Sequence, residues 1–213
     1  MKTATRPHGL LLLGCAAVVL AACSDDGTSP VETASMSAAL TDSGAASAVG
    51  GAFSSDTGGP QPVATLSGDM VGTAQVFAYT DTDGWVELNA PQNVTLALQS
   101  GTLATLATDT SVPPGTYTRV RLVLSDFHAD VAAGSVVDGI TLSTGVSIAM
   151  GGSDHMVQLE ADVAPVTVAA ETAATVVVDL HSASWVTQEA ASAEMADDAA
   201  IQAAATASVQ TSQ

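Results

Sequence analysis

The sequence predicts an all-β fold, organised as a single antiparallel β-sandwich. Between residues 63 and 187, Val, Leu, Ile, Thr and aromatic residues occur in short runs in which apolar and polar side chains alternate. Such alternation is typical of strands with one buried face, and Gly, Pro, Asp and Asn separate the runs as turn residues do. A region of about 125 residues is large enough for two sheets packed around one core.

The turns of this region also favour strands over helices. Asp83-Gly84 is a hairpin signal between two apolar runs. The segment 113–115, Pro-Pro-Gly, ends one connection and starts a strand, and Gly151-Gly152 supplies positive φ angles. The candidate strands cover residues 63–72, 73–80, 84–89, 94–98, 102–108, 116–127, 136–143, 146–150, 155–161, 166–170 and 174–186.

Two flanking segments have a different composition. Residues 23–62 consist mainly of Ser, Ala, Gly, Thr and Asp, with too few large apolar side chains to offset the entropy of ordering, so we expect a flexible tether. Residues 188–213 are rich in Ala and have little apolar face, which predicts a frayed helix or a disordered tail. The folded domain is therefore expected at residues 63–187.

Residues 1–22 have the three parts of a secretory signal peptide. Lys2 and Arg6 form a basic start, an apolar run follows, and small residues precede Cys23. The segment "LAAC", residues 20–23, resembles the lipobox of a bacterial lipoprotein signal. This resemblance implies cleavage before Cys23, diacylglycerol on its sulfur, and a further acyl chain such as palmitate on the new amino group. Two or more chains are enough for stable membrane anchoring.

The residue after the lipobox indicates the membrane in which the protein is anchored, and the two cysteines limit the chemistry of the mature chain. Ser24 stands where an Asp would favour the inner membrane, so the same resemblance implies sorting to the outer membrane. Ordinary secretion with cleavage nearby is the alternative. Because Cys15 lies in the signal and Cys23 is expected to be lipidated, no thiol remains for a disulfide, a metal site or a nucleophile.

The charge of the chain argues against two classes of partner. Of the four Lys and Arg residues, Lys2 and Arg6 lie in the predicted signal, so two remain against 22 acidic residues, a formal charge of −20. Nucleic acids and anionic lipid surfaces bind clustered Lys and Arg, so neither is an expected partner. We interpret the acidic surplus as a solvated surface, with salt adaptation or cation binding as alternatives.

Several segments in a fixed order resemble one known family. Trp85 is followed by Leu88, and then come "VTLALQSGTLATLA", "VPPGTYTRVRLVLS" and "VVVDLHSASWV". Together, over about residues 65–186, they resemble the lipoprotein-borne family catalogued as domain of unknown function forty-three eighty-two. The resemblance implies a secreted β-sandwich and carries no activity, substrate or catalytic residue. The "PPGTY" start also occurs in transthyretin-like sandwiches, so an immunoglobulin- or transthyretin-like arrangement is expected.

The two remaining basic residues, Arg119 and Arg121, lie in one predicted strand. Alternation places them with Tyr117 on one face, while Val120 and Leu122 face the core. This face is a possible binding surface for an anion or a sugar, because Arg binds carboxylates in a bidentate manner and Tyr stacks on rings. Cross-strand pairing with some of the many carboxylates is the favoured interpretation.

Aromatic residues of the preceding hairpin could extend this face. Tyr79 shares a strand face with Phe77, and Trp85 follows the next turn. In a chain with few aromatic residues, packing in the core is the favoured interpretation. Trp185, near the end of the last predicted strand, is interpreted in the same way.

Two groups of acidic residues are weak metal candidates. Asp126, His128 and Asp130 are spaced by two, but on a straight strand they span about 13 Å, too far to share one ion. Asp81 and Asp83 resemble a fragment of a calcium loop that lacks its third ligand and its later Glu. We therefore predict neither a metal site nor a cofactor, and we interpret Asp81 and Asp83 as turn residues.

These observations favour a lipid-anchored protein of the cell envelope whose domain is a non-catalytic interaction or scaffold module. The sequence has no G-x-S-x-G elbow, H-E-x-x-H pair or P-loop, so no enzyme is predicted. One alternative is a carbohydrate-binding module with Tyr79, Trp85 or Tyr117 exposed, and another is a calcium-dependent adhesion domain with acidic loops. The expected partners are the membrane, through Cys23, and an envelope protein or a glycan.

Overall fold

The computed structural model describes residues 32–44, 51–52 and 64–211. In these ranges the chain is mostly β, as predicted, with two main sheets, one small ribbon and four short helices. Residues 1–31, which include the predicted signal peptide and Cys23, lie outside the described part, and no described helix is long and apolar enough to cross a membrane. The helices are η1 (Gly152–Asp154), η2 (Ser182–Ser184), α1 (Gln188–Ala193) and α2 (Asp198–Ala204), and the ribbon pairs β8 (Val136–Val137) with β9 (Ile140–Thr141).

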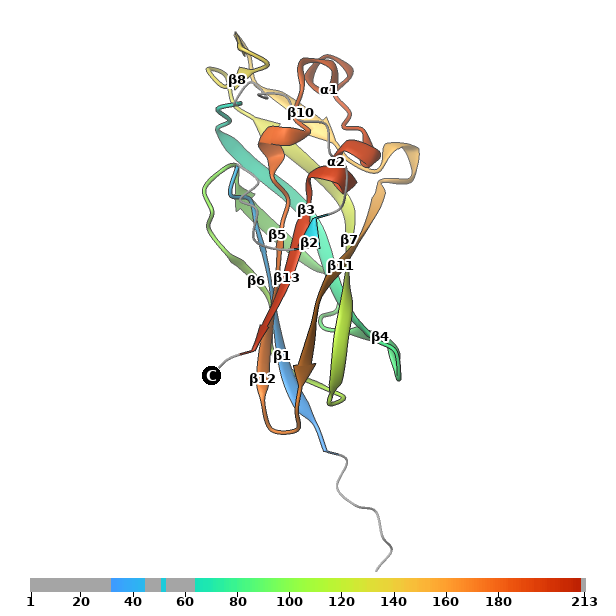
Figure 1. Cartoon of the computed structure of the whole chain (residues 1–213). Helices are drawn as coiled ribbons and strands as arrows, with labels where there is room; N and C mark the ends of the chain where they lie inside the picture. The colour runs from blue at the N-terminus through green and yellow to red at the C-terminus, as the bar shows by residue number, and fades with distance from the viewer. Residues whose placement is uncertain (1–31, 45–50, 53–63, 212–213) are drawn as a thin grey trace, which may run out of the picture. The chain divides into compact units, whose positions relative to one another are not determined.

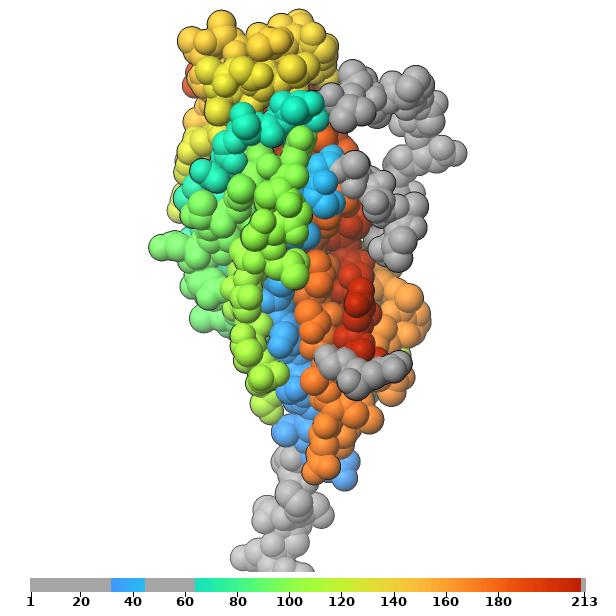
Figure 2. Space-filling view, turned by 90° about the vertical axis from the view of Figure 1, so that its left-hand side faces the viewer, coloured from blue at the N-terminus to red at the C-terminus, as the bar shows by residue number. Residues whose placement is uncertain are grey.

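The first sheet has the strand order β2-β13-β12-β1-β6. In Figure 2, β1 is the blue stripe between green β6 and orange β12. β1 runs parallel to β12 and antiparallel to β6, so the first sheet is mixed. The prediction of a purely antiparallel sandwich is therefore wrong for this sheet. No tight turn joins β1 to either neighbour, so hairpin geometry does not dictate its direction. The strands are β1 (Ala34–Thr41), β2 (Gly51–Ala52), β6 (Ala104–Val112), β12 (Ala173–Asp179) and β13 (Thr206–Thr211).

The second sheet is built on two long antiparallel strands, β3 (Gly68–Thr80) and β7 (Gly115–Val131). Each of them has two further antiparallel partners on its other side, which pair with different parts of its length. The partners of β3 are β4 (Gly84–Glu87) and β5 (Gln92–Ala97), and those of β7 are β10 (Val146–Ala149) and β11 (Met156–Val168).

Both sheets contribute to one hydrophobic core. It combines Met36 and Leu40 of β1 with Leu122 and Leu124 of β7 and Val176 of β12, all of which are buried. Along β12, buried residues alternate with partly exposed ones, as the sequence pattern predicts. The prediction of a mainly β domain with a packed core is therefore confirmed.

The predicted flexible tether, residues 23–62, is wrong for residues 34–41. This segment, ASMSAALT, forms β1 in the interior of the first sheet. Met36 and Leu40 are fully buried, and Ala34 and Ala38 are buried with them. A strand between two neighbours gains backbone hydrogen bonds on both edges, so small side chains suffice to hold it there.

Residues 188–213 are the predicted Ala-rich tail. The prediction that they form a frayed helix or a disordered segment is wrong for residues 188–211, the part that the structure describes. Thr187 and Asp197 cap α1 and α2, because their side chains accept hydrogen bonds from backbone N–H groups of the first turns. Ile201 of α2 is fully buried, and β13 extends the first sheet with Ala207 and Val209 buried. The folded domain therefore extends beyond residues 63–187 on both sides.

The domain has two structurally different ends (Figure 1). At the first, which we call the β1 end, β1 begins beside the turn between β11 and β12. There the Glu171 N–H donates to the Thr33 carbonyl and the Ser35 N–H donates to the Thr172 carbonyl, both at 3.0 Å. β1 and β12 run in parallel to the opposite end, which we call the helical end because η2, α1 and α2 follow β12 there.

Candidate functional site

The second sheet brings both arginines of the domain together with two aromatic side chains. Trp85 on β4, Tyr79 on β3 and Arg119 on β7 are register partners in a single row across three strands. Arg121 lies two residues further along β7, opposite Glu160 on β11. We call these five residues the arginine face.

The aromatic rings of the arginine face are stacked against its guanidinium groups. Arg119 Cζ lies 3.8 Å from the ring centroid of Tyr79 and 5.2 Å from that of Trp85, and Arg121 Cζ lies 4.0 Å from the Trp85 ring. The Tyr79 and Trp85 rings meet edge to face, with centroids 5.2 Å apart. All four side chains are half-buried, and these distances are typical of cation–π and aromatic attraction. The four side chains therefore hold one another in place.

Arg121 also forms a cross-strand ion pair of the kind that the sequence favours. Its Nη2 and Nε atoms lie 2.6 and 2.8 Å from Oε1 of Glu160, and the Gln158 amide donates to the same oxygen at 2.9 Å. The two charged side chains are 24% and 37% exposed, so water screens the pair and its contribution to stability is small. Arg119 differs, because within the described ranges its guanidinium group stacks on rings and forms no salt bridge.

Tyr117 does not belong to the arginine face, so its predicted placement is wrong. An irregularity between Tyr117 and Arg119 shifts the register of β7 against both of its neighbours. This bulge turns the phenol into the core, where the hydroxyl donates to the Pro113 carbonyl at 2.7 Å. Burial raises the pKa of Tyr117 to about 12, and the negative charge of Asp83 adds to the shift. Tyr117 therefore secures the turn that precedes β7.

A second bulge separates the weak metal candidates of β7. Asp126 has a left-handed backbone with φ of 49°, and the next residue, Phe127, points into the core. His128 and Asp130 remain close, with Nε2 and Oδ2 3.5 Å apart. Among the residues that the structure describes, no three His, Cys, Asp or Glu side chains are grouped to hold a metal ion. The common strand face on which this candidate depended is interrupted at Asp126.

Asp81 and Asp83 lie in the hairpin between β3 and β4. The Asp83 N–H donates to Thr80 Oγ1 at 2.9 Å, and the Thr80 hydroxyl donates to the Asp83 carboxylate at 3.3 Å. Gly84 follows with φ of 75°, a conformation that costs Gly little. These bonds shape the turn, while both carboxylates stay exposed.

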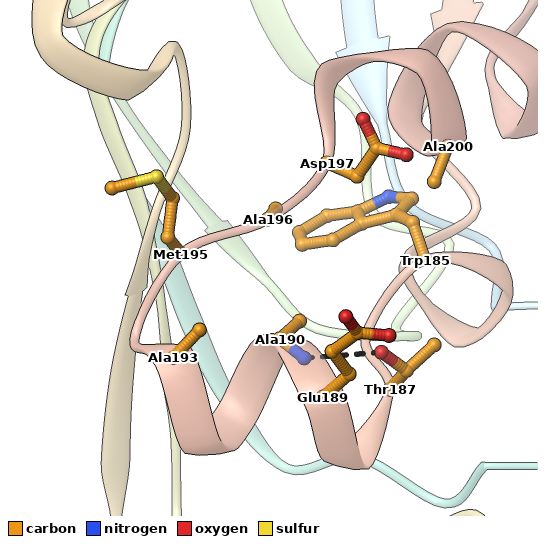
Figure 3. Close-up of a pocket in the computed structure, with 9 residues that line it drawn as sticks. All are labelled: Trp185, Thr187, Glu189, Ala190, Ala193, Met195, Ala196, Asp197 and Ala200. Carbon is orange, nitrogen blue, oxygen red and sulfur yellow. Dashed lines mark hydrogen bonds between the residues drawn. The ribbon is translucent and has the colours of Figure 1, made fainter.

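A pocket at the helical end was missed by sequence reasoning. It has a volume of about 420 Å³ and is lined by α1, α2 and the segments beside them. Figure 3 shows the Trp185 indole between the carboxylates of Glu189 and Asp197, with alanine methyl groups and Met195 completing the walls. Trp185 is buried and its Nε1 donates to the Leu180 carbonyl at 3.0 Å, so the ring forms the floor. Alanine-rich walls carry no motif that could have revealed the pocket.

A buried polar junction, also missed, lies where β1, β12 and β13 meet η2. The buried Asp42 carboxylate accepts hydrogen bonds from the backbone N–H and the hydroxyl of Ser182. Beside it, His181 Nδ1 lies 3.4 Å from Asp179 Oδ1, and His181 Nε2 lies 3.0 Å from Thr206 Oγ1. Asp179 and His181 are close in sequence, but Asp42 comes from the predicted flexible tether and Thr206 from the predicted Ala-rich tail. The bonds tie distant parts of the chain together, which indicates a structural role.

Comparison with known proteins identifies the family. The family model described as Domain of unknown function (DUF4382) matches residues 52–195. The match includes the whole second sheet and its arginine face, but neither β1 nor β13. No curated protein and no solved structure matches the chain. The chain belongs to the family Domain of unknown function (DUF4382), as its "PPGTYTRVRL" strand and accompanying segments indicate.

Proposed function

We propose that the protein is an exported lipoprotein of the cell envelope, anchored in the outer membrane through Cys23, and that its domain is a non-catalytic interaction module. The signal-like residues 1–22 and the lipobox support the anchoring. Two sheets that share one core support an immunoglobulin- or transthyretin-like sandwich. The polar junction around Asp42 and His181 bonds strands to one another, which supports a role without catalysis.

The arginine face is the observation that carries this proposal. Trp, Tyr and Arg are the residue types most enriched at the energetic centres of protein interfaces. The chain has only two Trp and two Tyr, and one of each meets Arg119 and Arg121 on this face. Because mutual stacking already restrains these side chains, less rotamer entropy is lost when a partner docks.

The same contacts favour a protein partner over a sugar. A sugar ring stacks on the flat face of an aromatic side chain, and guanidinium groups already cover a face of Tyr79 and of Trp85. Exposed carboxylates of Asp81, Asp83 and Glu87 lie on the hairpin that carries Trp85. Charge complementarity therefore favours a protein partner that places basic side chains around this hairpin.

Photocrosslinking in intact cells tests the interaction module. We expect a photoreactive residue in place of Glu87, exposed beside the arginine face, to give a discrete protein adduct. The same residue in place of Thr108, exposed on β6 of the other sheet, should give none. Trp85→Ala should abolish the adduct, whereas Thr95→Ala on β5 should preserve it. Equal adducts at both positions, or an adduct that survives Trp85→Ala, would reject a specific interface on this face.

Thermal unfolding of the mature chain with added ligands separates the alternative functions. A ligand that binds only the folded state and is present at 100 times its Kd adds about 2.7 kcal/mol of stability. We expect no such shift with calcium, magnesium or a panel of oligosaccharides. A shift with one sugar would replace our proposal by a carbohydrate-binding module, and a shift with calcium would replace it by a cation-dependent adhesion domain.

A further inference from the structure

The start of β1 limits how far the domain can stand from its predicted lipid anchor. Ten residues, 24–33, separate Cys23 from Ala34, the first residue of β1. Eleven Cα–Cα steps lead from Cys23 to Ala34, and at no more than about 3.6 Å each they span about 40 Å even when fully extended. Because β1 is an interior strand of the first sheet, its start is fixed to the domain.

The position of Ala34 within the domain is equally well defined. Hydrogen bonds on either side of it join Thr33 and Ser35 to the turn between β11 and β12, at the β1 end. The helical end lies at the far ends of β12 and β7. β7 pairs with the end of β11 at Gly115 and with the start of β10 at Val131, and its 17 residues correspond to about 55 Å of strand. The domain is therefore longer than the reach of the segment that connects it to Cys23.

We propose that the β1 end is the surface that faces the bilayer holding Cys23, and that the helical end and its pocket are held away from the membrane. This proposal rests on the lipid anchoring of Cys23 proposed above. The β1 end carries the exposed carboxylates of Glu32, Glu171, Asp81 and Asp83. Burying charges in hydrocarbon is costly, so this end faces the headgroups without inserting into the bilayer.

In this orientation, the arginine face and the pocket over Trp185 lie at different distances from the membrane. Tyr79 and Trp85 lie next to the hairpin of the β1 end, so the arginine face is directed to partners close to the membrane. The pocket over Trp185 lies away from the membrane, on the side of the surrounding compartment.

Energy transfer to labelled lipid measures this orientation on the full lipidated chain. Single cysteines replace exposed residues at each end, with Ala169→Cys at the β1 end and Ser192→Cys at the helical end, and each carries a donor dye. The protein is placed in phosphatidylcholine vesicles that contain rhodamine-labelled phosphatidylethanolamine. We expect transfer from position 169 to exceed transfer from position 192 by more than about twofold, because about the length of β7 separates them. A second pair, Thr82→Cys and Ser143→Cys, should show the same order.

Two controls separate this inference from the proposed anchoring. Inserting ten Gly and Ser residues between positions 24 and 33 should lower transfer from both ends and preserve their order. Mass spectrometry of the same preparations reports the acyl chains on Cys23. Acyl chains together with equal or reversed transfer would overturn the orientation alone. Absence of acyl chains would overturn both the anchoring and the orientation that rests on it.

Discussion

The guanidinium group of Arg119 stacks on the ring of Tyr79, its register partner on the neighbouring strand β3, with 3.8 Å between Cζ and the ring centroid. The chain has 22 acidic residues and few basic ones, yet among the described residues the Arg119 side chain is in contact with an aromatic ring and not with a carboxylate. The neighbouring Arg121 combines both modes, because it stacks on Trp85 and pairs with Glu160. The arginine face is thus ordered before any partner binds.

The Arg119–Tyr79 stack should appear as an energetic coupling. A partly exposed cation–π contact contributes about 0.5–1 kcal/mol, so a double-mutant cycle of Arg119→Ala and Tyr79→Ala should give a coupling free energy of that size in urea unfolding. In a control cycle, the changes in the free energy of unfolding caused by Arg119→Ala and by Thr95→Ala on β5 should add without coupling. A coupling free energy of zero for Arg119 and Tyr79 would show that the two side chains are in contact without stabilising the fold.

Tyr117→Phe should destabilise the fold by about 1 kcal/mol, because it removes the hydrogen bond from the buried hydroxyl to the Pro113 carbonyl. The ring itself stays in place, so the slope of unfolding against urea should not change. Thr116→Ala on the adjacent residue removes a hydroxyl whose hydrogen bond to the Thr167 hydroxyl is exposed to water, and it is the matched control with a smaller expected effect. A Phe variant as stable as the native protein would mean that the hydrogen bond contributes nothing.

The same hydroxyl should make stability fall at high pH. Burial raises the pKa of Tyr117 from 10.0 to about 12, with Asp83 adding to the shift, so the folded state favours the neutral phenol. The resulting stability is fully present below pH 10 and is lost as the pH rises from 10 through about 12. Urea unfolding of the native protein and Tyr117→Phe across this window should show a smaller loss in the variant. Parallel curves would contradict the assignment to Tyr117.

Leu40→Ala should destabilise the domain by about 2–5 kcal/mol, the range for truncating a fully buried Leu. Leu40 lies in the segment that composition alone marks as a tether, so this variant tests whether β1 belongs to the core. Ser35→Ala, at a half-buried position of the same strand, should change stability far less. If Leu40→Ala left the unfolding midpoint unchanged, β1 would not be part of the cooperative fold.

Gly72→Ala should also destabilise the domain, by about 1–3 kcal/mol, because no room exists for a methyl group. A Cβ atom at position 72 would lie 2.5 Å from both Cα and Cδ2 of Phe127, the residue that the second bulge turns inward. Gly115→Ala is the matched control, since its Cβ would meet the Thr80 methyl group at an ordinary 3.6 Å. Similar unfolding midpoints for the two variants would contradict tight packing of Phe127 on Gly72.

Local sequence signals were sufficient to predict many of the strands and turns of the second sheet. The alternation in β3 and β7, the Asp83-Gly84 turn and the Pro113 turn depend on residues near one another in sequence, and both strands include the predicted runs 73–80 and 116–127. The predicted break between residues 72 and 73 is wrong, because β3 is continuous from Gly68 to Thr80, and β7 continues four residues beyond the predicted end. The placement of Arg119 and Arg121 on one face was also predictable, because no bulge lies between them. Their aromatic partners were not, since stacking depends on which strand pairs with β7.

Bulges caused the errors within β7. Strict alternation places Tyr117 beside Arg119 and Asp126 beside His128, and one extra residue at each position changes which face follows. A bulge is set by the partner strands, such as the close approach of Gly72 to Phe127, and leaves little trace in the sequence of the strand itself.

By itself, the sequence determined the β class of the domain, its family and the strand that carries both arginines, because alternation, turn chemistry and motif order are local properties of the chain. Only the tertiary structure decided that residues 34–41 and 206–211 complete the first sheet, that Tyr117 is a core residue, and that Trp85 and Tyr79 stack on the arginines. The physical reason is that small side chains such as Ala and Ser carry little hydrophobic signal of their own. Their place is set by backbone hydrogen bonds and burial that neighbouring strands, distant in sequence, supply.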